Sequence, residues 1–478
     1  CLARIPGPRP RYPLIGNLDM FRIPGVSQTE STYRILVSLC KLYNNYGIYK
    51  ILLGQKPIPI LSSNINIEKS YIYKFLSDWL GDGLVLSTGS KWKGRRKLLT
   101  PAFHFRKLDD YLPVMNKQTN IFLDIIRNKQ IDGQQQQQQQ QQQSYIDIRE
   151  PVVQLVLDII CETAMGVQVG AQLGQNQSYV SDIHYMGKVF MKRIFMPWIW
   201  SDRIFYWTSI GRKFRKSLDS FHLFTRNVIN EKIRQFKKGM AFLDLLLDYY
   251  IKDNNNNTDT DNDNKLSSLE DIREEVDTFM FNGHESTSTS IGWSLYLIGL
   301  HPNVQQKIGN ELTRIFGRRE SDINRDISLD DIQQLTYLKC VIEESLRLYP
   351  SAPFIARRLV EDCPVGIDDD TGANGYVIPA GVDVFLMIAE MHLDSLVFAD
   401  PNRFRPERFE SDSVTMSQIN AYNYVPFSAG PRGCIGKRFA LIEQMIILAK
   451  ICQNFTIESM KPLDSIQTSA EMAYRAKK

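Results

Sequence analysis

The pattern of apolar and polar residues divides the chain into a short mixed N-terminal part and a long helical part. Two β-type runs, at residues 49–54 and 56–61, lie one residue apart and predict a hairpin. Pro57 and Pro59 in the second run favour the edge of a sheet, because proline cannot donate to a neighbouring strand. From about Ser90 to Tyr349 the spacing of apolar residues predicts mostly helix.

The longest predicted helix follows Ser268 and ends near Leu300. Ser268 is a suitable N-cap with Asp271 three residues later, and His301-Pro302 ends the pattern. At 1.5 Å per residue, ~32 residues span about 48 Å, enough to cross a whole domain. Polar residues and a glycine fill positions 282–289 in its apolar middle, which is costly in a buried helix unless they have partners. This conflict between burial and polarity predicts a functional site.

Two low-complexity segments interrupt the helical part. Residues 134–143 are an unbroken glutamine run, and residues 253–264 contain only Asp, Asn and Thr. Neither segment can bury apolar area, so we expect both to be solvated loop inserts. Their simplest interpretation is tolerated expansion without a function.

Composition and charge exclude several classes of protein. The chain has 478 residues, 43% hydrophobic and 23% charged, which excludes a fully disordered chain, a collagen and a coiled-coil rod. A net charge of +4 is too balanced for a nucleic-acid-binding chain. Seven cysteines without a CxxC pair give no zinc pattern and favour a reducing compartment. No run of ~18 uncharged apolar residues occurs, so we expect no transmembrane helix in this chain.

The strongest chemical signal is a lone cysteine in a glycine-rich loop ahead of a long apolar helix. The pattern F-x-x-G-x-R-x-C-x-G is formed by Phe427, Gly430, Arg432, Cys434 and Gly436. A helix N-terminus favours the thiolate, and the glycines let a flat partner approach the backbone. A protein holds haem iron through sulfur in this way, whereas the alternative is a buried structural cysteine.

Several further motifs accompany this one in the order that is typical of the cytochromes P-450, which are haem-thiolate monooxygenases. The chain therefore resembles that family. Glu344 and Arg347 match the family's E-x-x-R, and residues 406–409 match its P-E-R-F. The resemblance implies that Arg408 joins Glu344 and Arg347 in a buried structural network. It also implies a single catalytic domain over residues 1–478, mainly α with a smaller β-rich lobe, whose N-terminal membrane anchor is absent from this chain.

The resemblance implies how the cofactor, non-covalent haem b, is held between the long helix and the Cys434 loop. Cys434 is the expected iron ligand. The other expected cofactor-binding residues are Trp92, Arg96, Arg357, Phe427, Arg432 and Gly436. Trp92 and Arg96 match the W-x-x-x-R that contacts the haem propionates, and Arg432 and Arg357 fit the same role. The alternative for the basic residues around Trp92 is a solvated face.

Residues 283–287 match the family's oxygen-activating stretch. Glu285 and Ser286 replace the commoner Asp and Thr but keep a carboxyl beside a hydroxyl, and we expect this catalytic pair to deliver protons. Serine lacks the methyl group that restrains the threonine rotamer. His284 has no role that the motif explains, and we expect it to be a packed histidine.

Residues 89–105 and the Phe279-Met280-Phe281 run resemble family 4, the fatty-acid ω-hydroxylases and their invertebrate relatives. In that group a glutamate often precedes Gly283 and can form an ester to a haem methyl, but here the residue is Asn282. The expected reaction inserts one oxygen atom from O2 into a C–H bond of a lipophilic substrate, a fatty acid or a related lipid.

Partners and location also follow from the resemblance. The expected electron donor is NADPH-cytochrome P-450 reductase docking on the Cys434 side, with cytochrome b5 a further candidate, at the endoplasmic reticulum membrane with the catalytic domain facing the cytoplasm. The aromatic-rich residues 193–207 either face that membrane or pack in the core. Two alternatives remain, an O2-independent haem-thiolate isomerase or dehydratase and a non-enzymatic haem sensor. An intact Glu285–Ser286 pair speaks against both.

Overall fold

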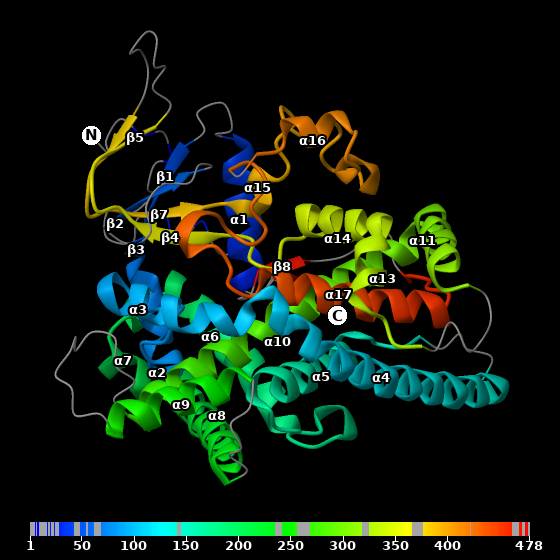
Figure 1. Cartoon of the computed structure of the whole chain (residues 1–478). Helices are drawn as coiled ribbons and strands as arrows, with labels where there is room; N and C mark the ends of the chain where they lie inside the picture. Colours follow the sequence, from blue (N-terminus) through cyan, green and yellow to red (C-terminus); the bar gives the residue numbers. More distant parts are fainter. Residues whose placement is uncertain are drawn as a thin grey trace.

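The structure is a computed structural model, and helices fill most of it. It describes residues 5, 7–8, 17, 20, 23, 28–42, 48–53, 56–61, 68–140, 145–234, 241–255, 268–317, 325–365, 376–420, 422–460, 468–470 and 474–476. Most strands gather in one small lobe at the upper left of Figure 1, and helices occupy the rest. The expected mainly α fold with a smaller β-rich lobe is therefore confirmed.

The α-helices of the described residues are distributed along most of the sequence. They are α1 (Gln28–Leu42), α2 (Ser77–Leu80), α3 (Gly89–Leu99), α4 (Phe105–Gln140), α5 (Arg149–Ile160), α6 (Gln177–Phe195), α7 (Asp202–Trp207), α8 (Ser209–Arg234), α9 (Phe242–Asn255), α10 (Leu269–Leu300), α11 (Pro302–Phe316), α13 (Leu329–Gln334), α14 (Thr336–Leu348), α15 (Ile388–Met391), α16 (Val414–Gln418) and α17 (Lys437–Asn454). Short 3-10 turns include η4 (Tyr71–Leu76), η8 (Pro197–Ile199), η10 (Pro406–Phe409) and η11 (Gly430–Arg432). None of the described helices is long and apolar enough to cross a bilayer.

The strands form one five-stranded sheet and two hairpins. The sheet has the order β1 (Ile48–Leu53), β2 (Lys56–Leu61), β7 (Asp383–Leu386), β4 (Ile355–Arg358) and β3 (Glu68–Lys69). The two hairpins pair β5 (Cys363–Val365) with β6 (Tyr376–Ile378), and β8 (Thr468–Ala470) with β9 (Tyr474–Ala476). The predicted β1–β2 hairpin is confirmed at one edge of the sheet. The pairing of β2 with β7 is confined to Ile60 and Leu61, so neither Pro57 nor Pro59 interrupts it.

Helix α10 has the predicted limits and crosses the centre of the molecule (Figure 1). Ser268 and Asp271 form a capping box, each side chain bonding the backbone N–H of the other residue. Helix α10 packs against α5, α8, α11, α14 and α17, so it is buried along much of its length. Several of its polar side chains bond their own helix, as Asn282 does through the Thr278 carbonyl and Ser286 through the Asn282 carbonyl. These bonds explain how a polar stretch is tolerated in a buried helix.

The glutamine run corrects one expectation. Helix α4 continues through Gln140, so residues 134–140 are helical and not a loop, while residues 141–143 lie outside the described part of the chain. Glutamine has a good helix propensity, and a helix already nucleated upstream is extended at little cost. In the second segment, residues 253–255 end α9 and the others lie outside the described residues.

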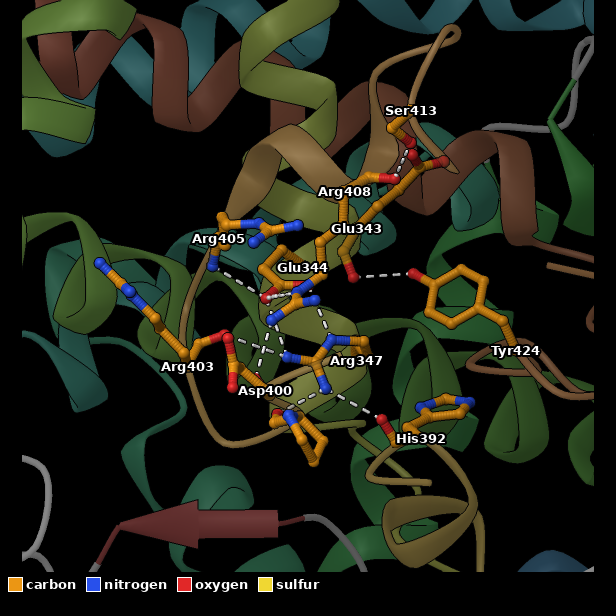
Figure 2. A network of polar contacts seen from close by, with 11 residues as sticks. Glu343, Glu344, Arg347, His392, Asp400, Arg403, Arg405, Arg408, Ser413 and Tyr424 are labelled. Atoms are coloured by element: carbon orange, nitrogen blue, oxygen red, sulfur yellow. Dashed lines mark hydrogen bonds and ion pairs between the residues drawn. The ribbon is translucent and has the colours of Figure 1, made fainter. Parts of the chain in front are cut away.

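A buried ion cluster joins α14 to η10 (Figure 2). Glu344 and Arg347 are fully buried and form two hydrogen bonds, of 2.7 and 2.8 Å. Arg408 of η10, also fully buried, lies 3.3 Å from the Glu344 carboxylate. Arg347 further donates to the backbone carbonyls of His392, Pro401 and Arg403. The network expected from the E-x-x-R and P-E-R-F motifs is therefore present.

We predict that Glu344→Gln lowers the free energy of unfolding by about 3–5 kcal/mol, since two buried guanidinium groups lose their carboxylate. Lys307→Gln is the matched control, because it breaks the exposed Lys307–Glu407 pair, which also reaches η10. That change should cost at most about 1 kcal/mol. Denaturant unfolding of both variants checks the prediction, and equal small losses would contradict it.

Candidate haem site

A cavity of about 300 Å³ lies between α10 and the loop that carries Cys434. Six predicted residues from two segments line it, namely Trp92 and Arg96 of α3 and Phe427, Arg432, Cys434 and Gly436 of the loop. Ser286 of α10 also lines it, whereas Glu285 and Arg357 do not. Sequence reasoning gave no site role to Lys69, Phe103 and Gln444 of the cavity wall; Lys69 and Gln444 belong to none of the motifs, and Phe103 lies in the family 4-like residues 89–105.

Backbone geometry presents Cys434 to the cavity two residues before Gly436, the N-cap of α17. The Cys434 N–H donates to the Phe427 carbonyl at 2.9 Å, which closes the loop. Gly430 has a φ of +67°, which a residue with a side chain rarely adopts. Gly430 therefore serves the turn and does not line the cavity, in contrast to Gly436.

Burial raises the pKa of the Cys434 thiol, although the sulfur faces the cavity. The Gly436 N–H, Arg96 and Lys437 act in the opposite direction, but they do not compensate for burial. The Gly436 N–H at the helix start therefore acts in the expected direction, but burial outweighs it. A cation at the sulfur would supply the missing stabilisation, which fits the chemistry of a metal-bound thiolate.

Positive charges gather on one wall of the cavity. Lys69, Arg96 and Arg432 all line it, and Arg357 lies close enough to lower the pKa values of Lys69 and Arg432. Burial, the largest cause, together with Arg357 and Arg96, lowers the pKa of Arg432 to about 10, against the opposing effect of Glu68. Crowded buried cations require anions, so this wall fits the two carboxylates of a haem.

Helix α3 explains why the W-x-x-x-R spacing matters. Trp92 and Arg96 are four residues apart and share the face that lines the cavity. The Arg432 guanidinium lies 4.0 Å from the centre of the Trp92 ring, a cation–π contact. Arg95 faces α10 instead and pairs with Asp271 at 2.7 Å and Glu275 at 3.8 Å. Arg96 therefore lines the cavity, whereas the adjacent Arg95 forms ion pairs with α10.

Arg357 differs from the other expected cofactor-binding residues in its position. It is buried on β4, donates to the neighbouring Ala356 carbonyl at 2.9 Å and is not part of the cavity wall. Lys69 lines the wall instead, on strand β3, which pairs with β4 opposite Arg357. Strand β3 has two residues, too few for an apolar pattern to mark it. Arg357 contributes charge from behind the wall.

The predicted acid–alcohol pair is divided between two cavities. A second cavity, of about 260 Å³, adjoins the first, and Glu285 lines this second cavity alone. The residues that line both are Lys69, Val85, Asn282, Ser286, Ser351, Ala352 and Ile355. The Glu285 carboxylate also lies 4.0 Å from the His184 imidazole of α6. Ser286 therefore stands at the junction of the two cavities, and Glu285 lies behind it.

Two neighbours of that pair are set by packing. His284 is fully buried and its Nδ1 contacts the Met280 carbonyl at 2.6 Å, as expected of a packed histidine. Gly283 allows α5 to approach α10, since a Cβ there would lie 2.7 Å from the Ile160 side chain. Ile160 and Gly283 both line the first cavity.

The fold, together with a cysteine that faces the central helix across a cavity, is that of a haem-thiolate monooxygenase. The sequence profile of the cytochrome P450 family matches residues 6–477, and the chain belongs to that family. Its cofactor is non-covalent haem b.

Relatives place the chain among the family 4 proteins. It is 39% identical to cytochrome P450 4V2 of Rattus norvegicus, over 98% of this chain and 87% of the relative. The Homo sapiens cytochrome P450 4V2 is 37% identical, over 97% and 86% of the two chains. Cytochrome P450 4c3 of Drosophila melanogaster is 32% identical, over 100% and 88%. The resemblance to family 4 is therefore confirmed.

We predict that acidified organic solvent extracts the haem completely after turnover. Asn282 lines the cavity where family 4 often has a glutamate, and an amide cannot form the ester. Asn282→Glu should instead give slow, turnover-dependent attachment, with Asn282→Gln as the control of equal size. Haem that stays with the denatured wild-type chain would refute the prediction and direct attention to Glu285.

Proposed function

We propose that Cys434 ligates the haem iron and that Trp92, Arg96 and Arg432 hold the propionates, with Phe427 and Gly436 lining the sulfur side. The observation that carries the proposal is the joint presence of Cys434 and the basic wall in one cavity beneath α10. Arg357 acts on the propionates by its charge from behind Lys69 and Arg432. All of these residues then belong to one catalytic domain.

When bound, the haem thiolate supplies oxygen activation, by which one atom of O2 enters a C–H bond and the other leaves as water. Ser286 at the junction of the cavities can hold a water molecule with its hydroxyl. Glu285 lines the adjoining cavity and can pass a proton toward that water. The otherwise apolar surroundings keep unwanted water away from the reacting atoms.

The substrate that we propose is a fatty acid or a related elongated lipid. Apolar side chains predominate in the second cavity, which is lined by Ile72, Leu76, Leu80, Val85, Phe190, Met191, Phe281, Ala352, Pro353, Phe354 and Ile355. An apolar chain gains free energy by leaving water for such a cavity. Because Asn282 and Ser286 lie on both walls, an end of that chain can reach the haem side.

We further propose an endoplasmic reticulum location with the domain facing the cytoplasm, and NADPH-cytochrome P-450 reductase, with cytochrome b5 a further candidate, as electron donor. Trp198, Ile204 and Trp207 are 57%, 53% and 85% exposed on η8 and α7, just after the α6 residues Phe190 and Met191 of the second cavity. Exposed tryptophans suit a membrane interface. In contrast, the other apolar residues of the segment pack in the core, namely Ile194, Phe195, Ile199 and Phe205. We therefore propose that part of the segment 193–207 faces the membrane and that the rest belongs to the core.

The whole proposal is tested by NADPH consumption with reductase and a lipid panel, with and without O2. A monooxygenase requires O2 and yields a hydroxylated lipid. Conversion of substrate without O2 or reductase would indicate the isomerase or dehydratase alternative. A chain that binds haem but converts no lipid under either condition would indicate the haem sensor.

We predict that Cys434→His abolishes the red-shifted Soret band of the reduced carbon monoxide complex, since imidazole replaces the thiolate. Cys452→Ser is the control, because Cys452 lies on α17 but does not line the haem cavity. The control should keep the wild-type spectrum. Persistence of the band in the Cys434→His protein would show that another group ligates the iron.

We predict that Ser286→Ala diverts NADPH electrons to peroxide and lowers product formation by about 10²–10⁴-fold, the usual range for a lost proton-transfer group. Ser288→Ala is the matched control, since Ser288 is buried on the same helix and does not line the cavity. Ser286→Thr should retain coupling because the hydroxyl remains. Equal coupling in the Ser286→Ala and Ser288→Ala proteins would be incompatible with the proposed role.

A further inference from the structure

His392 lies between the buried ion cluster and the loop that carries Cys434. It directly follows α15 and is fully buried. Its backbone carbonyl accepts a hydrogen bond of 2.9 Å from Arg347, which is visible in Figure 2. Its ring Nε2 accepts the backbone N–H of Val425, also at 2.9 Å. A single residue therefore contacts the cluster through its backbone and the loop through its side chain.

Val425 begins the turn that leads to Cys434. Its carbonyl accepts the Ser428 N–H at 2.9 Å, and the Phe427 carbonyl accepts the Cys434 N–H at 2.9 Å. Ser428 has a φ of +59°, a left-handed conformation that a serine keeps only when its surroundings hold it. A turn of this kind needs a fixed starting point, and the bond from Val425 to His392 provides one.

The imidazole is suited to this task because it stays neutral. Burial, followed by the charge of Arg347, lowers the pKa of His392 to about 3, so Nε2 remains an acceptor at neutral pH. Tyr424 packs on the ring with 5.0 Å between the centroids. Its hydroxyl donates to the Glu343 carbonyl of α14 at 2.8 Å, which ties the same segment to α14 a second time (Figure 2).

We propose that His392 is a positioning residue for the haem thiolate. By accepting the Val425 N–H, it couples the Glu344–Arg347–Arg408 cluster to the Cys434 loop and holds the sulfur in place against the cofactor. The proposal rests on Cys434 as the iron ligand. His392 itself lines neither cavity, so its effect on the iron is indirect.

The test compares two variants of His392 with a matched control. His392→Leu removes the acceptor and leaves the Val425 N–H buried without one, whereas His392→Gln can present an oxygen close to the position of Nε2. Asn116→Leu is the control, because Asn116 on α4 likewise accepts a buried backbone N–H, that of Ile327, at 2.9 Å. Asn116→Leu also loses two bonds that its amide donates, to the Leu112 and Ile327 carbonyls, so it is no milder a change than His392→Leu but removes no bond from the Cys434 loop.

The readouts are the rate at which the reduced carbon monoxide complex changes from the thiolate to the non-thiolate spectrum, and the denaturant midpoint of each protein. We expect roughly ten-fold faster conversion in His392→Leu, a near wild-type rate in His392→Gln, and no acceleration in Asn116→Leu despite a similar midpoint. If the rate of this spectral change rises in both leucine variants in proportion to the fall in their denaturant midpoints, the proposal is overturned. If wild-type protein lacks the thiolate spectrum, the ligand assignment itself fails, which is a distinguishable result.

Hydrogen exchange in the wild-type holoenzyme tests the same contact without a substitution. The Val425 amide should exchange as slowly as the buried amides of α14, because its N–H is bonded within the core. Fast exchange at Val425 would overturn the proposal even if His392→Leu cannot be purified.

Discussion

The attraction between one buried carboxylate and two buried guanidinium groups holds α14 and η10 together. Glu344 bonds Arg347 within α14, approaches Arg408 of η10 and accepts the backbone N–H of Arg405 at 2.9 Å. Each of these charges would be costly to bury alone, so their elements must come together. The cluster therefore makes the distant segments around residues 344 and 408 dependent on each other, and His392 extends that dependence to the Cys434 loop.

The cavity holds charges that a suitable ligand would stabilise. On its wall Arg432 repels Lys69 and is repelled by Arg96, and burial opposes ionisation of Cys434. In the arrangement that we propose, an anionic, iron-containing cofactor would satisfy both demands, because its carboxylates would meet the cations and its metal the sulfur. A ligand that binds only the native state stabilises it, so folding and cofactor binding are linked in this protein.

Much of this arrangement could be predicted from the sequence where a local rule applies. The limits of α10 follow from its capping box and from His301-Pro302, and the cavity face of α3 follows from the i, i+4 spacing of Trp92 and Arg96. The motif around Cys434 indicates the loop because its residues are contiguous.

Other features depend on tertiary packing, which cannot be predicted from a local sequence pattern. Lys69 comes from a two-residue strand, and Arg357, its partner on β4, is not part of the cavity wall. Glu285 and Ser286 are adjacent in sequence, yet one residue corresponds to ~100° of rotation about a helix, so Ser286 lines both cavities whereas Glu285 lines only the second. The helical glutamines of α4 show that composition alone does not distinguish a loop from the extension of an existing helix.

The close approach of α5 and α10 at Gly283 has an evolutionary consequence. A Cβ at residue 283 would lie 2.7 Å from Ile160, a stiff β-branched side chain on the same cavity wall. A larger residue at 283 is therefore acceptable only together with a smaller one at 160, and the reverse change would open space beside the haem. Across homologous sequences these two positions should covary, although 123 residues separate them, and their combined volume would be one quantity by which selection adjusts the shape of the cavity.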